Sequence, residues 1–342
     1  MKTTPFYDPL KTYEENYQDG PFGAFTEKRV ARPPFIPFGI PAGPLLNGKF
    51  INSALNHGFD IPIHKTVRTR KYKCHPWPNV LAVHIKGDLT IEKASNQLVA
   101  DTNYSWPLSI TNSFGNPSRD PDIWQKDIKK SVKHAKKGQM VWGSFEGTHW
   151  DGSSAKDYIN DWVLGAKLLK EANAQAVEAN FSCPNEGTAN LLCFDVAKVQ
   201  IICNAIKNEI GNTSLYIKTA YYQDQKLLEK LVENVGKIVD GFSSINTIQA
   251  EVVGRNGKQA LPGEGRKRSG ICGESIRWAG LNMVARLKKL REKLGFSYKI
   301  VGVGGVMTAR DYFEYRKNGA DIVMSATGAM WNPLLAQDIK KR

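Results

Sequence analysis

The sequence predicts a (β/α)8 TIM barrel with long loops over the C-terminal face, and three observations favour this fold. Apolar, β-branched segments alternate with longer amphipathic segments along most of the 342 residues, which is typical of a parallel sheet wrapped by helices. Eight such units suit a chain of this size, and polar residues gather where the apolar segments end, as they do in barrels. A doubly wound sheet is disfavoured because its glycine-rich loop follows the first strand, whereas Gly304 and Gly305 come late.

The apolar segments define the expected elements in order. Eight strands are predicted at residues 37–42, 61–66, 139–144, 176–181, 214–219, 241–248, 299–304 and 322–327. Helical spacing between them predicts helices at 155–171, 196–209, 225–235, 276–294 and 309–318. The last helix has the capping-box spacing of Thr308 and Asp311 before it and the stop signal Asn318-Gly319 at its end.

Two long segments, residues 67–111 and 251–275, interrupt the alternation. Loops of this length are usually lids or binding loops, so both are expected on the active-site side. Residues 1–36 form an N-terminal extension without the apolar core of a secretory signal. Because no repeat or low-complexity linker divides the chain, we predict a single domain spanning residues 1–342.

The composition argues against several classes of protein. No apolar run approaches the roughly 18 residues of a membrane span, so we predict no membrane partner and a cytoplasmic location. The five cysteines are scattered without a CxxC pair, which predicts reduced thiols and no metal site. The net charge is +14. Its lysines cluster on predicted outer helices without an RNA-binding signature, so we predict no nucleic-acid partner.

Residues 178–185, Glu-Ala-Asn-Phe-Ser-Cys-Pro-Asn, form the stretch most informative about chemistry. They end a predicted strand with two carboxamides, a hydroxyl and a thiol around one bend. Pro184 restricts the backbone before it to extended geometry, which holds Cys183 at the strand end. The alternative is an ordinary buried cysteine before a turn.

Glycines and lysines at other strand ends predict an anionic ligand. Gly304 and Gly305 precede a capped helix, and the following strand ends near Thr327. The loops after strands seven and eight are the usual phosphate site of a barrel, although a tight turn would also use paired glycines. Lys65 and Lys218 end the second and fifth strands beside apolar residues, where an ammonium without a partner is unfavourable.

Nine short motifs, in one order from about residue 37 to 333, resemble the dihydroorotate dehydrogenase family. The pyrimidine-reducing domain of dihydropyrimidine dehydrogenase is a close relative of this family. The motifs are Pro41-Ala42-Gly43, His64-Lys65-Thr66, Asn112-Ser113-Phe114-Gly115, Asn180-Phe181-Ser182-Cys183-Pro184-Asn185, Ile217-Lys218, Ile245-Asn246-Thr247, Ser269-Gly270-Ile271-Cys272-Gly273, Gly302-Val303-Gly304-Gly305 and Ala326-Thr327.

The resemblance implies an FMN cofactor at the barrel mouth and a planar dihydropyrimidine substrate, whose alternating C=O and N–H groups suit carboxamide partners. The implied FMN-binding residues are Ala42, Gly43, Lys65, Thr66, Asn112, Asn180, Lys218, Ile245, Gly273, Gly304, Gly305, Ala326 and Thr327. The implied substrate-binding residues are Lys65, Asn112, Ser113, Phe114, Gly115, Asn116, Asn180, Asn185, Asn246 and Thr247.

The resemblance also implies the chemistry, with Cys183 and Lys65 as catalytic residues. Cys183 would take the C5 proton as a general base while hydride leaves C6 for the flavin. Lys65 would stabilise the negative charge that develops on the flavin. The function implied is oxidation of dihydroorotate to orotate in de novo pyrimidine synthesis by a homodimer of the soluble, cysteine-base class. The electron acceptor, fumarate or NAD through a partner subunit, stays open.

Three alternatives stay open. The segment 67–111 is longer than in the soluble class, and Gly43 is followed by Pro44-Leu45-Leu46, which would suit a reductase of another dihydropyrimidine. A tRNA-dihydrouridine synthase is also a flavin barrel with a cysteine before a proline, and it would account for the net charge of +14. The third alternative is a barrel that serves only as a binding or scaffold protein.

Overall fold

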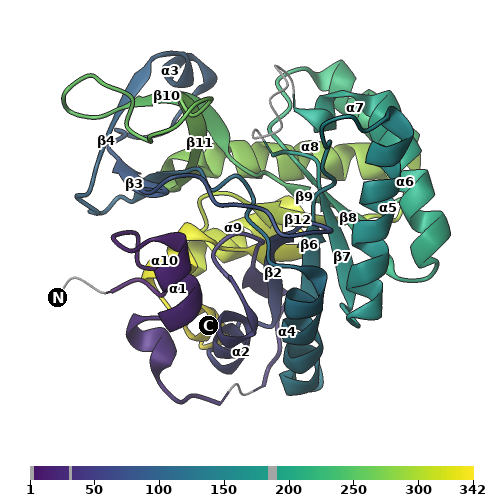
Figure 1. Ribbon diagram of the computed structural model, residues 1–342, viewed down its shortest axis with the longest axis horizontal. Helices are drawn as coiled ribbons and strands as arrows, with labels where there is room; N and C mark the ends of the chain where they lie inside the picture. The colour runs from purple at the N-terminus through teal and green to yellow at the C-terminus, as the bar shows by residue number, and fades with distance from the viewer. Residues whose placement is uncertain (1–3, 31–32, 184–190) are drawn as a thin grey trace.

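Eight parallel strands close into a barrel, as the sequence predicts. The computed structural model describes residues 4–30, 33–183 and 191–342, and in this part of the chain the strand order is β1-β13-β12-β9-β8-β7-β6-β2 (Figure 1). The strands are β1 (Phe38–Ile40), β2 (Ile61–Val67), β6 (Trp142–Phe145), β7 (Ala176–Asn180), β8 (Ser214–Thr219), β9 (Gly241–Ser244), β12 (Lys299–Val303) and β13 (Ile322–Met324).

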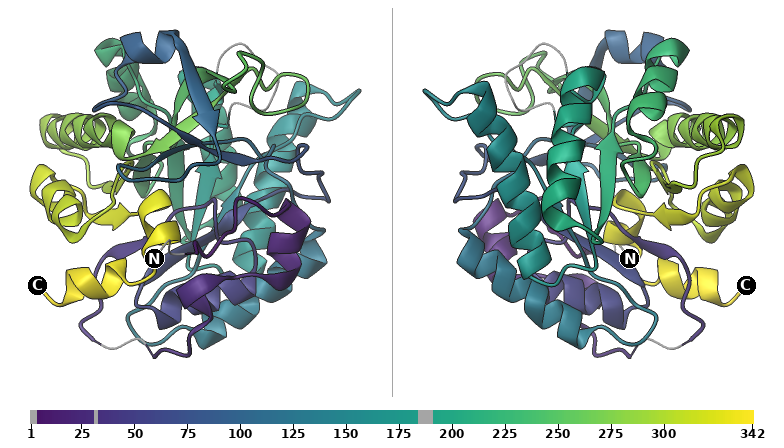
Figure 2. Two further views of the ribbon diagram at one scale, coloured as in Figure 1. Left: turned by 90° about the vertical axis from the view of Figure 1, so that its left-hand side faces the viewer. Right: turned by 90° about the vertical axis from the view of Figure 1, so that its right-hand side faces the viewer.

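Amphipathic helices cover the outside of this barrel (Figure 2). They are α2 (Gly48–Asn56), α4 (Pro121–His134), α5 (Ala155–Glu171), α6 (Val196–Ile210), α7 (Gln225–Val235), α8 (Arg277–Leu294) and α9 (Ala309–Asn318). The five predicted helices agree with the structure to within one residue at each end. The capping box of Thr308 and Asp311 is present, and its hydrogen bonds start α9.

Bulky side chains fill the barrel at the end where the strands begin. The rings of Trp142 and Tyr216 lie 4.3 Å apart, and Ile63, Val301 and Met324 pack with them. None of these residues carries a charge, so they form an apolar cluster.

The two long segments, residues 67–111 and 251–275, contain paired strands. They form a second closed sheet, here called the second barrel, in the order β10-β11-β5-β3-β4. Its strands β4 and β10 pair in parallel although Gln97 and Glu251 are 154 residues apart. The strands are β3 (Val80–Val83), β4 (Gln97–Asp101), β5 (Ser109–Asn112), β10 (Ile248–Val253) and β11 (Arg268–Gly273).

Three predicted strands have one end that differs from the structure by three or more residues. The predicted strand 241–248 is divided, since β9 ends at Ser244 and β10 begins at Ile248, where the chain leaves the large barrel for the second one. The predicted strand 322–327 ends at Met324, since Thr327 already begins α10 (Thr327–Trp331). The predicted strand 139–144 begins later, at Trp142.

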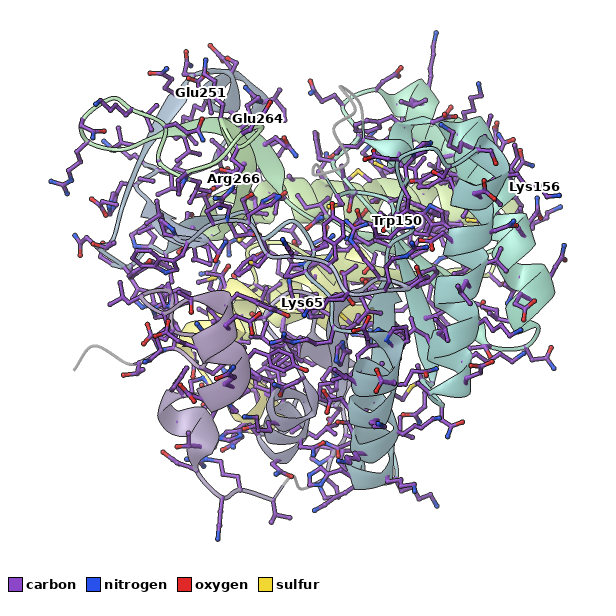
Figure 3. All side chains as sticks on the ribbon, in the orientation of Figure 1. Lys65, Trp150, Lys156, Glu251, Glu264 and Arg266 are labelled. Atoms are coloured by element: carbon purple, nitrogen blue, oxygen red, sulfur yellow. The ribbon has the colours of Figure 1, made fainter. Side chains whose placement is uncertain are left out.

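Arg266 fastens the two insertions to each other. Its side chain is buried, and its guanidinium donates to the carbonyl oxygens of Pro76 at 2.8 Å, Pro78 at 3.1 Å and Ser113 at 2.8 Å. Three backbone carbonyls thereby accept hydrogen bonds from a single side chain. Figure 3 shows Arg266 beside the second barrel and Lys65 nearer the centre of the molecule. The turn after β5 is consequently held in place at the barrel mouth.

The N-terminal extension packs over the same end of the barrel. After α1 (Tyr13–Asp19) comes a short 3-10 helix, Gly23–Thr26. Phe6 is buried, and its N–H donates to the carbonyl of Met330 in α10 at 3.0 Å. The Tyr7 ring meets the Phe114 ring edge-on at 5.6 Å. Of the described helices, α3 (Ile91–Ser95) and α11 (Leu335–Lys340) included, none is long and apolar enough to cross a bilayer.

Candidate active site

A pocket lies at the strand C-termini of the large barrel, beneath the second barrel. With its open mouth it encloses about 1010 Å³. Most residues predicted to bind a ligand line this one pocket. They are Ala42, Gly43, Lys65, Thr66, Asn112, Ser113, Phe114, Asn116, Asn180, Cys183, Lys218, Asn246, Thr247, Ala326 and Thr327.

A second hollow adjoins the first and shares Ala326 and Thr327 with it. Gly273, Gly304 and Gly305 form part of its wall. All three glycines have positive φ angles, of +100°, +123° and +66°, a conformation that L side chains rarely adopt. This hollow is where the paired glycines predict a phosphate site.

Two of the predicted residues that the structure describes, Ile245 and Gly115, line neither hollow. Ile245 is completely buried behind the pocket, where its N–H donates to the carbonyl of Val303 at 2.8 Å. Gly115 does not line the pocket. A Cβ at this glycine would lie 2.5 Å from the His75 imidazole, so the glycine allows the turn to pass that ring. Asn185 lies outside the described residues.

Two buried lysines face the pocket. Lys65 is 4% exposed, its Nζ lies 4.7 Å from the centroid of the Phe114 ring, and burial lowers the pKa of Lys65 to about 8. Lys218 is equally buried, and its Nζ donates to the carbonyl of Ala42 at 3.2 Å. Neither lysine forms an ion pair with any residue that the structure describes. A pocket with two such cations favours an anionic ligand.

Carboxamide side chains also line the pocket. Ser182 connects two of them, since its Oγ donates to Oδ1 of Asn180 at 3.0 Å and its carbonyl accepts from Nδ2 of Asn246 at 3.1 Å. Nδ2 of Asn112 donates to Sγ of Cys272 at 3.5 Å. These contacts fix the amide groups without using all of their donors and acceptors.

Cys183 is 8% exposed and follows β7. Its Sγ accepts a hydrogen bond from Nδ2 of Asn116 at 3.0 Å, and the same Nδ2 also donates to the carboxylate of Glu146. Glu146 in turn pairs with Nη2 of Arg68 at 3.0 Å. Arg68 and Glu146 were not predicted as site residues, because they are 78 positions apart and belong to no motif.

The pocket wall also contains residues that sequence reasoning missed. Tyr7 reaches it from the N-terminal extension, and its buried hydroxyl has no hydrogen-bond partner among the described residues. Burial raises the pKa of Tyr7 well above its usual value. Cys272 belongs to a quoted motif and is a neutral thiol at pH 7, because burial raises its pKa. The other missed wall residues are Pro41, Pro44, Val80, Ile110, Gly270, Val303 and Met330.

The fold and the pocket are those of a (β/α)8-barrel enzyme. Its pocket at the strand C-termini suits an anionic ligand with many hydrogen-bonding groups. Within the described residues, no group of three or more His, Cys, Asp or Glu side chains is arranged to hold a metal ion.

Comparison with known proteins identifies the family. The family model of dihydroorotate dehydrogenase matches residues 100–342. The chain is 32% identical over 360 aligned residues to dihydroorotate dehydrogenase of Dictyostelium discoideum, covering 97% of this chain and 95% of that protein. The chain belongs to the dihydroorotate dehydrogenase family and is an oxidoreductase.

Two further similarities are more distant. The catalytic subunit of dihydroorotate dehydrogenase B (NAD(+)) from Bacillus cytotoxicus is 26% identical over 189 residues, which cover 55% of this chain and 57% of that subunit. The crystal structure of an Eimeria tenella DHODH in complex with ferulenol superposes with a TM-score of 0.68 at 17% identity. It covers 89% of this chain and 79% of that one, and the likeness supports the barrel fold alone.

Proposed function

We propose that this protein oxidises dihydroorotate to orotate with FMN as its bound cofactor, and that Cys183 is the base. The family supports the reaction. The single observation that carries the proposal is the pair of buried cations, Lys65 and Lys218, in one pocket with carboxamides and a thiol. Dihydroorotate is an anion whose ring has alternating C=O and N–H groups, so it complements both kinds of side chain.

The residues of the adjoining hollow fit the phosphate of FMN. A Cβ at Gly305 would lie 2.6 Å from Cβ of Arg277, and a Cβ at Gly273 would lie 2.4 Å from the carbonyl oxygen of Leu108, so only glycine leaves this backbone free to meet a phosphate. A Cβ at Gly43 would have no other atom within 4 Å, so there is open space beside this glycine. The phosphate would be held by the amides of Gly304, Gly305, Ala326 and Thr327.

The remaining proposed FMN contacts are Ala42, Gly43, Lys65, Thr66, Asn112, Asn180, Lys218, Ile245 and Gly273. When bound, FMN would supply a two-electron acceptor for the hydrogen that leaves C6 of the substrate. Lys65 and Lys218 would stabilise the negative charge that accumulates during this transfer.

The chain's own contribution to the chemistry is orientation and proton transfer. The carboxamides of Asn112, Asn180 and Asn246 would hold the ring in one plane. Cys183 would remove the proton from C5, next to a ring carbonyl, and store it on Sγ until solvent takes it. Ser182 would act only by orienting its two asparagine neighbours.

The first test is the absorption spectrum of the purified protein, followed by anaerobic titration with dihydroorotate. We expect a yellow protein that releases FMN on acid treatment and bleaches as dihydroorotate is added. Release of FAD, or a colourless protein that FMN does not reconstitute, would contradict the cofactor assignment. Bleaching by another dihydropyrimidine but not by dihydroorotate would show that the substrate is a different ring.

The second test concerns Cys183. Replacing it with Ala should leave FMN bound, because the thiol lies in the main pocket and does not line the phosphate hollow. Loss of a positioned base slows proton removal by about 10²–10⁴-fold, so anaerobic flavin reduction by dihydroorotate should slow by that factor. Cys203→Ala, a buried change in α6, is the control. Near-wild-type reduction in Cys183→Ala would show that the base lies elsewhere.

The family match favours dihydroorotate over the alternative substrate, tRNA. We expect gel shifts with tRNA at roughly 150 mM salt to show no tight complex, because loose charge-driven binding weakens steeply with salt. A tight, salt-resistant complex would instead support a dihydrouridine synthase. The homodimer and the cytoplasmic location stay predictions of the sequence, and light scattering of the purified protein tests the first.

A further inference from the structure

A chain of polar contacts leads from Cys183 into the body of the protein. The amide nitrogen of Asn116 donates to Sγ of Cys183 at 3.0 Å and also to Oε2 of Glu146. One carboxamide NH2 carries two hydrogens, so both bonds form at once. A donor on sulfur favours a thiolate over a thiol, because the negative charge makes sulfur the better acceptor.

Glu146 and Arg68 determine which way the amide of Asn116 points. With the amide reversed, its oxygen would face both the carboxylate and the sulfur, which are acceptors. Arg68 holds Oε1 of Glu146 through Nη2 at 3.0 Å and donates from Nε to the backbone carbonyl of Asn116 at 3.2 Å. The Arg68 guanidinium thus holds the carboxylate of Glu146 in place. It also holds the backbone of Asn116, whose side chain that carboxylate orients.

The ion pair between Arg68 and Glu146 is almost completely buried. Arg68 is 2% exposed and Glu146 is 1% exposed. A buried ion pair seldom adds stability over apolar residues of the same size, so stability alone is a weak reason for placing it here. Arg68 neutralises the carboxylate of Glu146. Glu146 can therefore orient Asn116 without opposing a negative charge on Cys183.

The backbone at Asn116 suits this role. Its φ angle of +48° is one of two positive values among the non-glycine residues that the structure describes, the other being +63° at Asn173. Asparagine tolerates this region better than most residues. The contributing residues follow β2, β6 and β7, which are neighbours in the barrel, so three strand ends and the turn after β5 converge on the sulfur.

We propose that Arg68 and Glu146 are positioning residues that hold the Asn116 carboxamide as a hydrogen-bond donor to Cys183, and that this donor maintains the thiolate needed for proton removal. The proposal rests on the proposed role of Cys183 as the base. When the thiolate takes the C5 proton, an S–H bond forms and the contact with Asn116 weakens, so the donor favours the reactive state over the protonated one.

Other charged groups also face Cys183, and they stay unchanged in the variants below. Lys65 on β2 attracts the thiolate, and Lys218 on β8 lines the same pocket. The titratable side chains of Tyr7 and Cys272 line it as well. Because their contributions are shared by every variant, a difference from wild type reports the donor and the residues that orient it.

The test measures the thiolate directly in the flavin-bound protein. Iodoacetamide reacts with thiolates and not thiols, so its rate with Cys183, followed by peptide mass spectrometry, is recorded from pH 6 to pH 10. Asn116→Gly removes the donor while keeping the backbone conformation, and Asn116→Asp replaces the donor with an acceptor. We expect both profiles to move to higher pH by about one to two pH units, and Asn116→Asp to move further.

Glu146→Gln tests the positioning residues, and we expect a shift in the same direction but smaller, because the amide is no longer locked. If this variant does not fold, the double variant Arg68→Met with Glu146→Gln leaves no unpaired buried charge and takes its place. Asn173→Gly is the matched control, since it removes the other left-handed asparagine, on the exposed turn after α5, and we expect a wild-type profile.

A wild-type alkylation profile in Asn116→Gly would overturn the proposal. A shift in Asn116→Gly with none in the Glu146 variants would overturn the positioning role of the ion pair. These outcomes are separable from failure of the proposed function. If Cys183→Ala reduced its flavin at the wild-type rate, Cys183 would not be the base, and the proposal would fall with the function even where the alkylation profile shifts.

Discussion

The buried charge of Lys65 is expected to lower the free energy of unfolding, and the variant Lys65→Met measures this effect. Burial lowers the pKa of Lys65 from 10.5 to about 8, which means that holding the charge in the folded state costs roughly 3 kcal/mol. Methionine keeps an unbranched side chain but loses the contact of Nζ with the Phe114 ring, about 1 kcal/mol. The flavin-free variant should therefore be more stable at pH 7 by roughly 2 kcal/mol.

The pH dependence of this gain follows from the direction of the pKa change. Below about pH 8, Lys65 is protonated in both the folded and the unfolded state, so the full difference between variant and wild type persists. Between about pH 8 and 10.5 the unfolded chain holds a proton that the folded protein lacks, so wild type becomes more stable as the pH rises. The advantage of Lys65→Met should therefore shrink across this range.

Urea unfolding of the flavin-free proteins at several pH values between 7 and 10 measures the effect. Lys130→Met, an exposed change on α4, is the control and should alter stability little. The same Lys65 variant should reduce its flavin about 10²-fold more slowly with dihydroorotate. A variant that is less stable than wild type at pH 7, or one whose advantage is the same at pH 7 and pH 10, would refute the reasoning.

Two further predictions concern the phosphate hollow and the second barrel. Gly305→Ala should lower FMN affinity at least tenfold by equilibrium dialysis, because its Cβ would lie 2.6 Å from Cβ of Arg277; Gly265→Ala has a similar positive φ but no atom within 4 Å, so it should bind FMN normally. Arg266→Met should destabilise the protein by about 3 kcal/mol or more in urea, because three backbone carbonyls lose a charged hydrogen-bond donor. Hydrogen exchange should then increase in residues 67–111 before it increases in the large barrel, and a uniform increase would contradict a local role for Arg266.

The large barrel was predictable from local patterns in the sequence. Each of its strands is a short apolar segment followed by an amphipathic helix, and both patterns are local properties of the chain. Helix α9 is an example, since Thr308, Asp311 and Gly319 set its two ends within a dozen residues. The pocket residues on these strands were predictable for the same reason, because residues at the ends of parallel strands meet at one edge.

The second barrel and the surroundings of Cys183 could not be predicted, because they depend on contacts between distant parts of the chain. Pairing of β4 with β10 depends on contacts between residues 154 positions apart, and the paired segments contain the turn-forming glycines that otherwise indicate loops. Tyr7 reached the pocket from an extension without any motif. Arg68, Asn116 and Glu146 met only because the ends of β2 and β6 converge with the turn after β5. Local patterns specify elements, whereas a buried polar group is satisfied by whichever partner the fold brings to it.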